Sequence, residues 1–240
     1  MKEEVMGQVL IKKAEKFEEL IELAKKIVVD EFKVAQRDRR SFLLELCGGR
    51  TPVKLYQQLN KELLLGQLEF PIEFFIGDER NVPWDHNKSN NFLVRNTLLN
   101  NNLEQIVHLH DFQTQLSRVE AAEVYANELD ELTPNGFDLA ILGIGKDGHF
   151  ASIFQGFTQW ETENKTVVTE TTENEVMERL SISPKFLLKA KKLLVLLAGA
   201  DKSPILDKLG DENLSREDFP AKFLLAHPNL EIIFSEEAAY

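Results

Sequence analysis

The stretch from Phe137 to Phe154 contains a continuous apolar run, Leu139–Leu142, that ends in three glycines, Gly143, Gly145 and Gly148. A short apolar run bounded by turn residues predicts a strand that is buried on both faces, as in a parallel sheet. Glycines directly after such a strand let the backbone adopt positive φ and come close to a ligand. Open α/β sheets bind their ligands at the carboxyl ends of the strands, so this stretch predicts both the fold class and the place of the site.

The rest of the chain alternates strands with helices. Apolar residues at helical spacing predict a long amphipathic helix from about Lys13 to Arg37. Further helices are expected at 51–66 (ended by Gly66), from Ser89, at 117–132, after Pro184, at 204–209 and at 220–226. Strands are expected at 41–46, 72–76, 108–110, 139–142, 166–169 (an edge strand), 179–183, 193–197 and 230–234. This order predicts an α/β fold with a mostly parallel sheet covered by helices on both faces, in a single domain of residues 1–240.

Composition limits the classes of partner and the compartment. The 240 residues carry a formal net charge of -12, which disfavours nucleic acid and anionic membranes as partners. Cys47 is the single cysteine, which excludes an internal disulfide and fits a reducing compartment. No apolar stretch approaches the about 18 residues of a membrane span, and the first residues lack the apolar stretch of a signal peptide. We therefore expect a cytoplasmic protein, a monomer or a weak homodimer, with a small-molecule substrate.

The turn after the strand at 41–46 has the composition of a phosphate-binding loop. Gly48 and Gly49 are followed by Arg50, then by Thr51 and Pro52, which suit the start of a helix. A strand, a glycine turn and a helix start together direct free N–H groups and the positive helix end at one point. The Gly-Lys-Ser/Thr ending of a P-loop is missing, and a plain tight turn is the alternative interpretation.

Charged residues directly follow the strand at 72–76. Asp78, Glu79 and Arg80 come at the point where that strand ends, and Ser89 and Asn90 open the next helix. The same topology places these residues at the edge of the sheet that the other two turns occupy. Solvated loop charges are the alternative.

The glycine spacing after the strand at 139–142 also matches a dinucleotide-binding fingerprint, with Glu170 at about the required distance. Against that ligand, Lys146, Asp147 and His149 crowd the turn where a pyrophosphate needs bare backbone. No second nucleotide signature accompanies it, so a dinucleotide is the weaker hypothesis.

His108 and His110 flank Leu109 in an alternating stretch and therefore point to the same face of a strand. Two histidines in this arrangement can bind a metal ion, but no third ligand is evident nearby in the sequence. We expect no metal site.

Three motifs now stand in order along the chain: Gly48–Pro52, Asp78–Arg80 with Ser89 and Asn90, and Leu142–Phe154. Together they resemble the glucosamine-6-phosphate isomerase/6-phosphogluconolactonase family. The likeness continues into Arg179 and its Ser-Ile-Ser strand, 199–202, 219–221 and 236–239. The resemblance implies a phosphosugar isomerase-like fold and hydrolysis of 6-phospho-D-glucono-1,5-lactone in the oxidative pentose phosphate pathway, without a metal or organic cofactor.

Several positions depart from the family pattern. Arg50 stands where the family usually has Ser, Gln155 stands where Pro is usual, and residues 173–178 replace a proline-rich approach. The deaminase branch has Tyr where this chain has Arg80, and a Glu after Asp-Gly-His that residues 151–155 do not supply. The lactonase branch is therefore favoured, with a deaminase-like enzyme or a non-catalytic phosphosugar-binding protein as alternatives.

The resemblance and the residue chemistry together assign roles. His149 is the expected general base toward water, and Asp147 orients its imidazole or positions substrate hydroxyls. Arg80 stabilises the oxyanion or holds substrate oxygens, while Asp78 or Glu79 holds its guanidinium. A helix beginning at His149 would keep that imidazole neutral. The phosphate is expected at Gly49, Arg50 and Thr51, with Arg179 and Lys202 converging on it. The other expected substrate-binding residues are Gly48, Asp78, Asn90 and Gly148.

Overall fold

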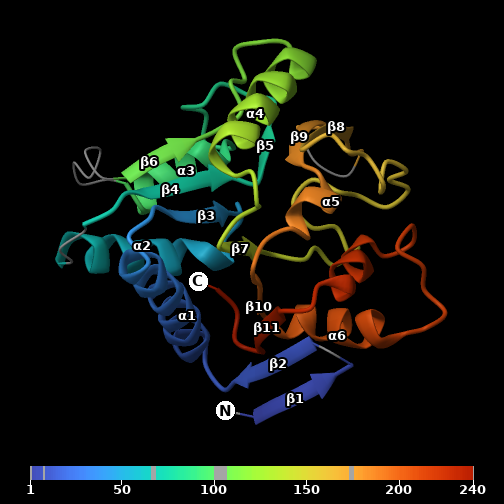
Figure 1. Ribbon diagram of the computed structural model, residues 1–240. Coiled ribbons are helices and arrows are strands. Elements are labelled where there is room, and N and C mark those ends of the chain that lie inside the picture. The colour runs from blue at the N-terminus through green and yellow to red at the C-terminus, as the bar shows by residue number, and fades with distance from the viewer. Residues whose placement is uncertain (1, 8, 66–68, 100–106, 173–175, 240) are drawn as a thin grey trace.

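An eight-stranded sheet runs through the centre of the computed structural model, which describes residues 2–7, 9–65, 69–99, 107–172 and 176–239 (Figure 1). From edge to edge its strands are β1 (Lys2–Met6), β2 (Val9–Ala14), β11 (Leu230–Ser235), β10 (Leu193–Ala198), β7 (Leu139–Leu142), β3 (Phe42–Leu46), β4 (Ile72–Ile76) and β6 (Val107–His110). The β1–β2 pair is antiparallel, and all the other neighbours are parallel. The prediction of a mostly parallel sheet is confirmed.

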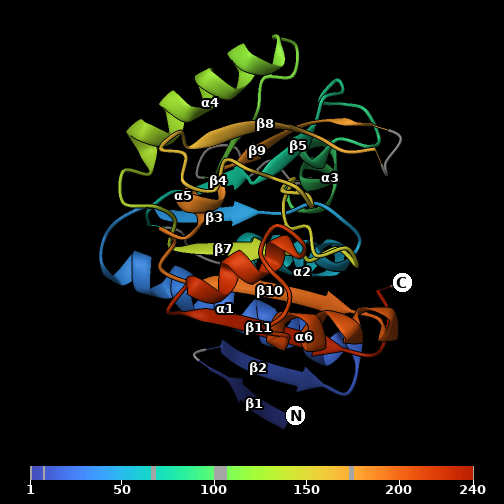
Figure 2. The same cartoon turned by 90° about the vertical axis from the view of Figure 1, so that its right-hand side faces the viewer.

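Helices cover both faces of this sheet, as the alternation of strands and helices predicts. One face carries α1 (Phe17–Arg37), α2 (Thr51–Leu65) and α3 (Asn90–Thr97); the other carries α4 (Arg118–Leu132), α5 (Pro184–Leu187), α6 (Ser203–Gly210) and the 3₁₀ helix η2 (Pro220–Ala226) (Figures 1 and 2). Each face buries its own apolar cluster against the sheet. The core therefore consists of two layers, and the central strands are apolar on both sides.

A second, antiparallel sheet corrects the expectation of a single one. It contains β5 (Asp78–Arg80), β9 (Glu178–Ile182) and β8 (Thr166–Glu170), in that order (Figure 2). Gly77 joins the two sheets, because it follows β4 directly and its carbonyl accepts a hydrogen bond from the Ile182 amide at 2.8 Å. Asp78–Arg80, which were expected only as charges that follow a strand, therefore form a short strand themselves, whereas β8 is an edge strand as predicted.

The amino-terminal region also differs from its prediction. Residues 9–14 form β2, so the first helix starts at Phe17 rather than at about Lys13. Parallel pairing of β2 with β11 buries Val9 and Ile11. The free energy gained by this burial and pairing favours a strand over the helix that the local pattern predicts. Two strands, β1 and β2, were thus missed. The predicted end of a helix at Gly66 lies outside the described residues.

Among the described helices, none combines the length and the apolar character that a membrane span requires. The single domain of residues 1–240 stays a prediction.

Candidate active site

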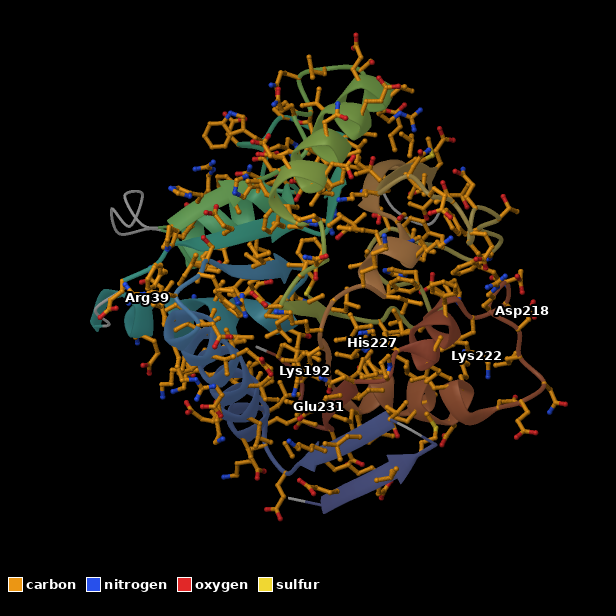
Figure 3. The ribbon with its side chains drawn as sticks, viewed as in Figure 1. Arg39, Lys192, Asp218, Lys222, His227 and Glu231 are labelled. Atoms are coloured by element: carbon orange, nitrogen blue, oxygen red, sulfur yellow. The ribbon has the colours of Figure 1, made fainter. Side chains whose placement is uncertain are left out.

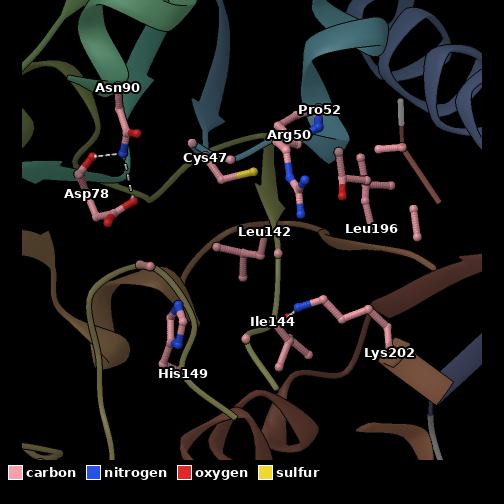
Figure 4. A pocket seen from close by; sticks show the side chains of 18 of the residues that line it. Cys47, Arg50, Pro52, Asp78, Asn90, Leu142, Ile144, His149, Leu196 and Lys202 are labelled. Carbon is pink, nitrogen blue, oxygen red and sulfur yellow. Dashed lines mark hydrogen bonds between the residues drawn. The ribbon is translucent and has the colours of Figure 1, made fainter. Parts of the chain in front are cut away.

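The three predicted turns meet at the carboxyl ends of the parallel strands and surround one cavity of about 500 Å³ (Figure 4). Its walls include most of the predicted site residues: Gly48, Gly49, Arg50, Thr51, Asp78, Arg80, Asn90, His149 and Lys202. They come from the β3–α2 turn, from β5 and α3, from the turn after β7 and from η1 (Ala200–Lys202). Asp147, Gly148 and Arg179 are not among the lining residues.

His149 and Asp147 form a hydrogen-bonded pair at one side of the cavity. His149 Nδ1 lies 2.6 Å from Asp147 Oδ1, and the same oxygen accepts the His149 backbone N–H at 3.4 Å. Burial alone would raise the pKa of Asp147, but the hydrogen bond and charge of His149 lower that pKa below its usual range. A carboxylate at Nδ1 makes this nitrogen the donor, so Nε2 is free to accept a proton.

A tight turn, and not a helix, presents His149. The Gly145 amide donates to the His149 carbonyl at 2.8 Å, and Gly148 has a φ of 88°, which a glycine adopts without strain. Ala151 also has positive φ, at 45°, so the backbone cannot continue as a helix. The hypothesis that a helix begins at His149 and keeps the imidazole neutral is therefore wrong.

The opposite side of the cavity is positively charged. Arg50 extends into it from the turn before α2, and Lys202 reaches toward Ile144, whose carbonyl accepts from Lys202 Nζ at 2.8 Å (Figure 4). Burial lowers the pKa of Lys202, and the charges of Lys146 and Arg50 lower it further, whereas those of Asp201 and Asp147 raise it. Gly49, with a φ of 95°, shapes the turn so that the start of α2 faces the same space. An anion bound here would relieve the repulsion between the two cations.

Glu79 has a different role from the predicted one. Its buried carboxylate accepts the backbone N–H groups of Asn90 and Asn91 and the hydroxyl of Ser89, each at 2.8 Å. It thus caps the start of α3, where free amides need an acceptor. The Arg80 guanidinium is held by the Lys88 carbonyl instead, at 2.6 Å from Nη1, so the expectation that Asp78 or Glu79 holds it is wrong.

Asp78 lies in the wall of the cavity, beside Asn90, and its side chain accepts two side-chain hydrogen bonds. Ser152 Oγ donates to Oδ2 at 2.6 Å, and Asn90 Nδ2 donates to Oδ1 at 3.2 Å (Figure 4). Asn90 Nδ2 also donates to the Asp78 backbone carbonyl, which fixes the amide and leaves Asn90 Oδ1 without a partner in the described structure. Sequence reasoning missed Ser152, although it lies within the third motif.

Arg179 is buried on β9, directly opposite Arg80 on β5. Burial lowers the pKa of Arg179, and the charge of Arg80 lowers it further. The structure therefore places Arg179 beside Arg80 rather than on the cavity wall, and its expected contact with phosphate stays a prediction.

His108 and His110 lie far along the sheet, on the edge strand β6, and bind carboxylates. His110 Nδ1 is 2.6 Å from Glu128 and its Nε2 is 2.8 Å from Glu73. Within the described ranges, no group of three or more histidine, cysteine or acidic side chains is placed to hold a metal ion. Burial by itself would lower the pKa of His110, but hydrogen bonds and charge from Glu128 and Glu73 raise it to about 9.

The His110→Gln variant is expected to lose stability in a pH-dependent way. Because the pKa of His110 is raised in the folded chain, its contribution is complete below about pH 6.5 and is lost as pH rises through about 9. A loss of about 1 kcal/mol lowers the melting temperature of a chain of this size by about 2–4 °C. Thermal unfolding of the wild type and His110→Gln at pH 6 and pH 10 measures this loss of stability. An equal loss at both pH values would contradict the raised pKa of His110.

Comparison with known proteins identifies the family to which this chain belongs. A family model described as glucosamine-6-phosphate isomerases/6-phosphogluconolactonase matches residues 15–233. The chain belongs to this family. A 6-phosphogluconolactonase of Chlamydia pneumoniae is 31% identical over 191 residues, covering 78% of this chain and 71% of that protein.

Solved structures of family members are similar over almost the whole chain. The 6-phosphogluconolactonase of Trypanosoma brucei has a TM-score of 0.80 and 28% identity, covering 95% of this chain and 96% of its own. The 6-phosphogluconolactonase of Thermotoga maritima also has a TM-score of 0.80, with 25% identity; the match covers 95% of this chain and 99% of that one. The predicted phosphosugar isomerase-like fold is confirmed.

Proposed function

We propose that this protein hydrolyses 6-phospho-D-glucono-1,5-lactone to 6-phospho-D-gluconate, the lactone step of the oxidative pentose phosphate pathway. The observation that carries the proposal is the shared cavity, in which the His149–Asp147 pair faces a cationic turn across a space of about 500 Å³. That volume suits a small phosphorylated sugar. A general base and an anion site on opposite sides fit a substrate with a reactive carbonyl and a distant phosphate.

His149 acts as the general base. Asp147 holds the proton on Nδ1, so Nε2 takes a proton from water as the water oxygen bonds to the lactone carbonyl carbon. The resulting oxyanion then re-forms the carbonyl, and the bond from this carbon to the ring oxygen breaks. The imidazolium returns its proton to the leaving ring oxygen, which becomes the hydroxyl of the open acid.

Arg80 stabilises the negative charge that develops on the carbonyl oxygen. Its guanidinium lines the cavity, and the bond to the Lys88 carbonyl fixes its direction before substrate binds. Preorganised donors of this kind stabilise a transition state without a cost of reorganisation. Arg179, which lies opposite Arg80 on the neighbouring strand β9, adds a second positive charge next to the Arg80 guanidinium.

The other residues bind the substrate. The backbone of Gly48, Gly49 and Thr51, with the side chains of Arg50 and Lys202, holds the phosphate. Asn90 accepts a substrate hydroxyl, because its Oδ1 is buried without a partner among the described residues. Asp78 lines the same part of the cavity and accepts another hydroxyl. Gly148 allows the close turn that presents His149.

We also propose that the chain works in the cytoplasm as a monomer or a weak homodimer. The residues assigned to the site surround one cavity of this chain, which supports a monomer as the working unit. Light scattering at micromolar concentration measures the assembly.

Proton release on addition of freshly prepared lactone tests the function. Hydrolysis produces a carboxylic acid, so the protein should release acid well above the spontaneous rate, and a protein that only binds phosphosugars should not. Acid release at the spontaneous rate alone would overturn the proposal. A deaminase-like activity would appear instead as ammonia released from glucosamine 6-phosphate.

A further inference from the structure

Glu45 is a carboxyl group in the middle of the apolar sheet. It lies on β3, with Phe75 of β4 and Ala140 of β7 opposite it, and its side chain is fully buried. Neither of its carboxyl oxygens has a hydrogen-bond partner of good geometry within the described residues; the Ile141 amide approaches the carboxyl group and lowers its pKa, but by less than burial raises it. No ion pair to it occurs there either. An unpaired carboxylate in such a place is very costly, whereas a neutral carboxylic acid is tolerated.

The carboxyl group lies directly against the junction of the two sheets. A β-carbon at Gly77 would collide with Glu45 Oε1, so the absence of a side chain at Gly77 makes room for it. The titratable groups that face Glu45 are Asp78 of β5, Cys47 at the end of β3, Tyr56 of α2 and Tyr125 of α4. All of these are acids, and none is a cation. Burial raises the pKa of Glu45 well above its usual range, and the charge of Asp78 raises it further.

Asp78, the acidic neighbour, is arranged as an anion. Both its carboxylate oxygens accept hydrogen bonds, one from Ser152 and one from Asn90. A protonated Asp78 would have to turn one oxygen into a donor, which the Asn90 amide nitrogen cannot accept and which the Ser152 hydroxyl could accept only by giving up its own donation to Oδ2. Two neighbouring carboxylates in a poorly solvated place hold one proton between them, and the hydrogen bonds to Asp78 leave that proton to Glu45.

We propose that Glu45 is a positioning residue that remains protonated in the folded protein and so keeps Asp78 an anionic acceptor in the cavity wall. Glu45 affects substrate binding only through Asp78 and its hydrogen-bond partner Asn90, and this effect on binding rests on the proposed function. The protonation itself does not depend on any activity.

Stability measured against pH, for the Glu45→Gln variant and the wild type, tests the protonation. Glutamine is a neutral side chain of the same shape. A glutamate whose pKa is raised in the folded chain binds its proton in the folded state but loses it in the unfolded state above about pH 4.3, so folding becomes less favourable as pH rises. Between pH 5 and the folded pKa, the unfolding constant of the wild type relative to Glu45→Gln should rise about tenfold per pH unit.

Glu231→Gln is the matched control (Figure 3). Glu231 is also a buried glutamate of the central sheet, but Lys12 Nζ lies 2.6 Å from its carboxylate. Its replacement leaves Lys12 without this partner and should destabilise the protein at neutral pH. Parallel stability curves for the wild type and Glu45→Gln over pH 5–8 would overturn the proposal.

A second pair of measurements separates this proposal from the proposed function. Glu45→Ala should raise KM about tenfold, because it removes the side chain that packs against Gly77, the residue directly before Asp78, and Glu45→Gln, which keeps that packing without a charge, should hold KM within about threefold of wild type. An infrared difference spectrum, wild type minus Glu45→Ala at pH 8, should contain the carbonyl band of a neutral carboxylic acid. Absence of that band would overturn the proposal even if Glu45→Gln fails to fold, whereas its presence without lactonase activity would overturn only the proposed function.

Discussion

Replacement of His149 by glutamine is expected to lower kcat about 10²- to 10⁴-fold, the usual contribution of a general base. KM should change by less than about threefold, because the phosphate and hydroxyl contacts come from other residues. The Asp147→Asn variant should also lower kcat, since an amide can donate to Nδ1 and so favour the wrong tautomer of the imidazole. Stopped-flow proton release with fresh lactone, corrected for spontaneous hydrolysis, measures both.

The His108→Gln variant is the matched control. His108 is an exposed histidine at the edge of the same sheet, remote from the cavity. Its replacement should leave kcat unchanged. A folded His149→Gln variant with wild-type kcat would remove His149 from the mechanism, and a similar loss in both variants would indicate a general effect on folding.

Replacement of Lys202 by methionine should raise KM about 10- to 150-fold, because a charge-assisted contact to phosphate contributes about 1.5–3 kcal/mol. Methionine keeps most of the aliphatic length of the side chain, so the change isolates the charge. The effect should be confined to the phosphorylated substrate, and hydrolysis of unphosphorylated glucono-1,5-lactone should be unaffected. Steady-state kinetics with the two lactones measures this difference.

Lys208→Met provides the control for this variant. Lys208 lies on α6, near Lys202 in sequence, but is exposed and outside the cavity lining. Its replacement should leave KM for both lactones unchanged. If Lys202→Met raised KM equally for both lactones, Lys202 would not bind the phosphate.

The sequence predicts the parallel sheet and the turns at its edge because both depend on local signals. The buried strand at 139–142 is apolar throughout, and Gly48 and Gly49 mark a turn before a helix whose first residues, Thr51 and Pro52, are typical of that position. Once parallel strands are recognised, their carboxyl ends must share an edge. The meeting of His149 with the glycine turn follows from topology alone.

The errors lie where distant pairing decides the local structure. Residues 9–14 become a strand through β11, more than 200 residues away, and β5 becomes a strand through β9. The hydrogen-bond partners of Glu79 and Arg80 likewise depend on how α3 packs against β5. No short sequence motif predicts that packing. Glu45 did have a signal, a single charge inside an apolar run, but its meaning depends on the neighbouring Asp78.

The hydrogen bond between Arg80 and the Lys88 carbonyl links the two ends of the segment 81–88, which leaves the small sheet and returns to α3. The guanidinium and this surface segment are therefore mechanically coupled. A ligand, an antibody or an insertion that displaces the segment would also draw the positive charge away from the reacting carbonyl. Changes made on the outside of residues 81–88 should for this reason slow turnover without touching the substrate.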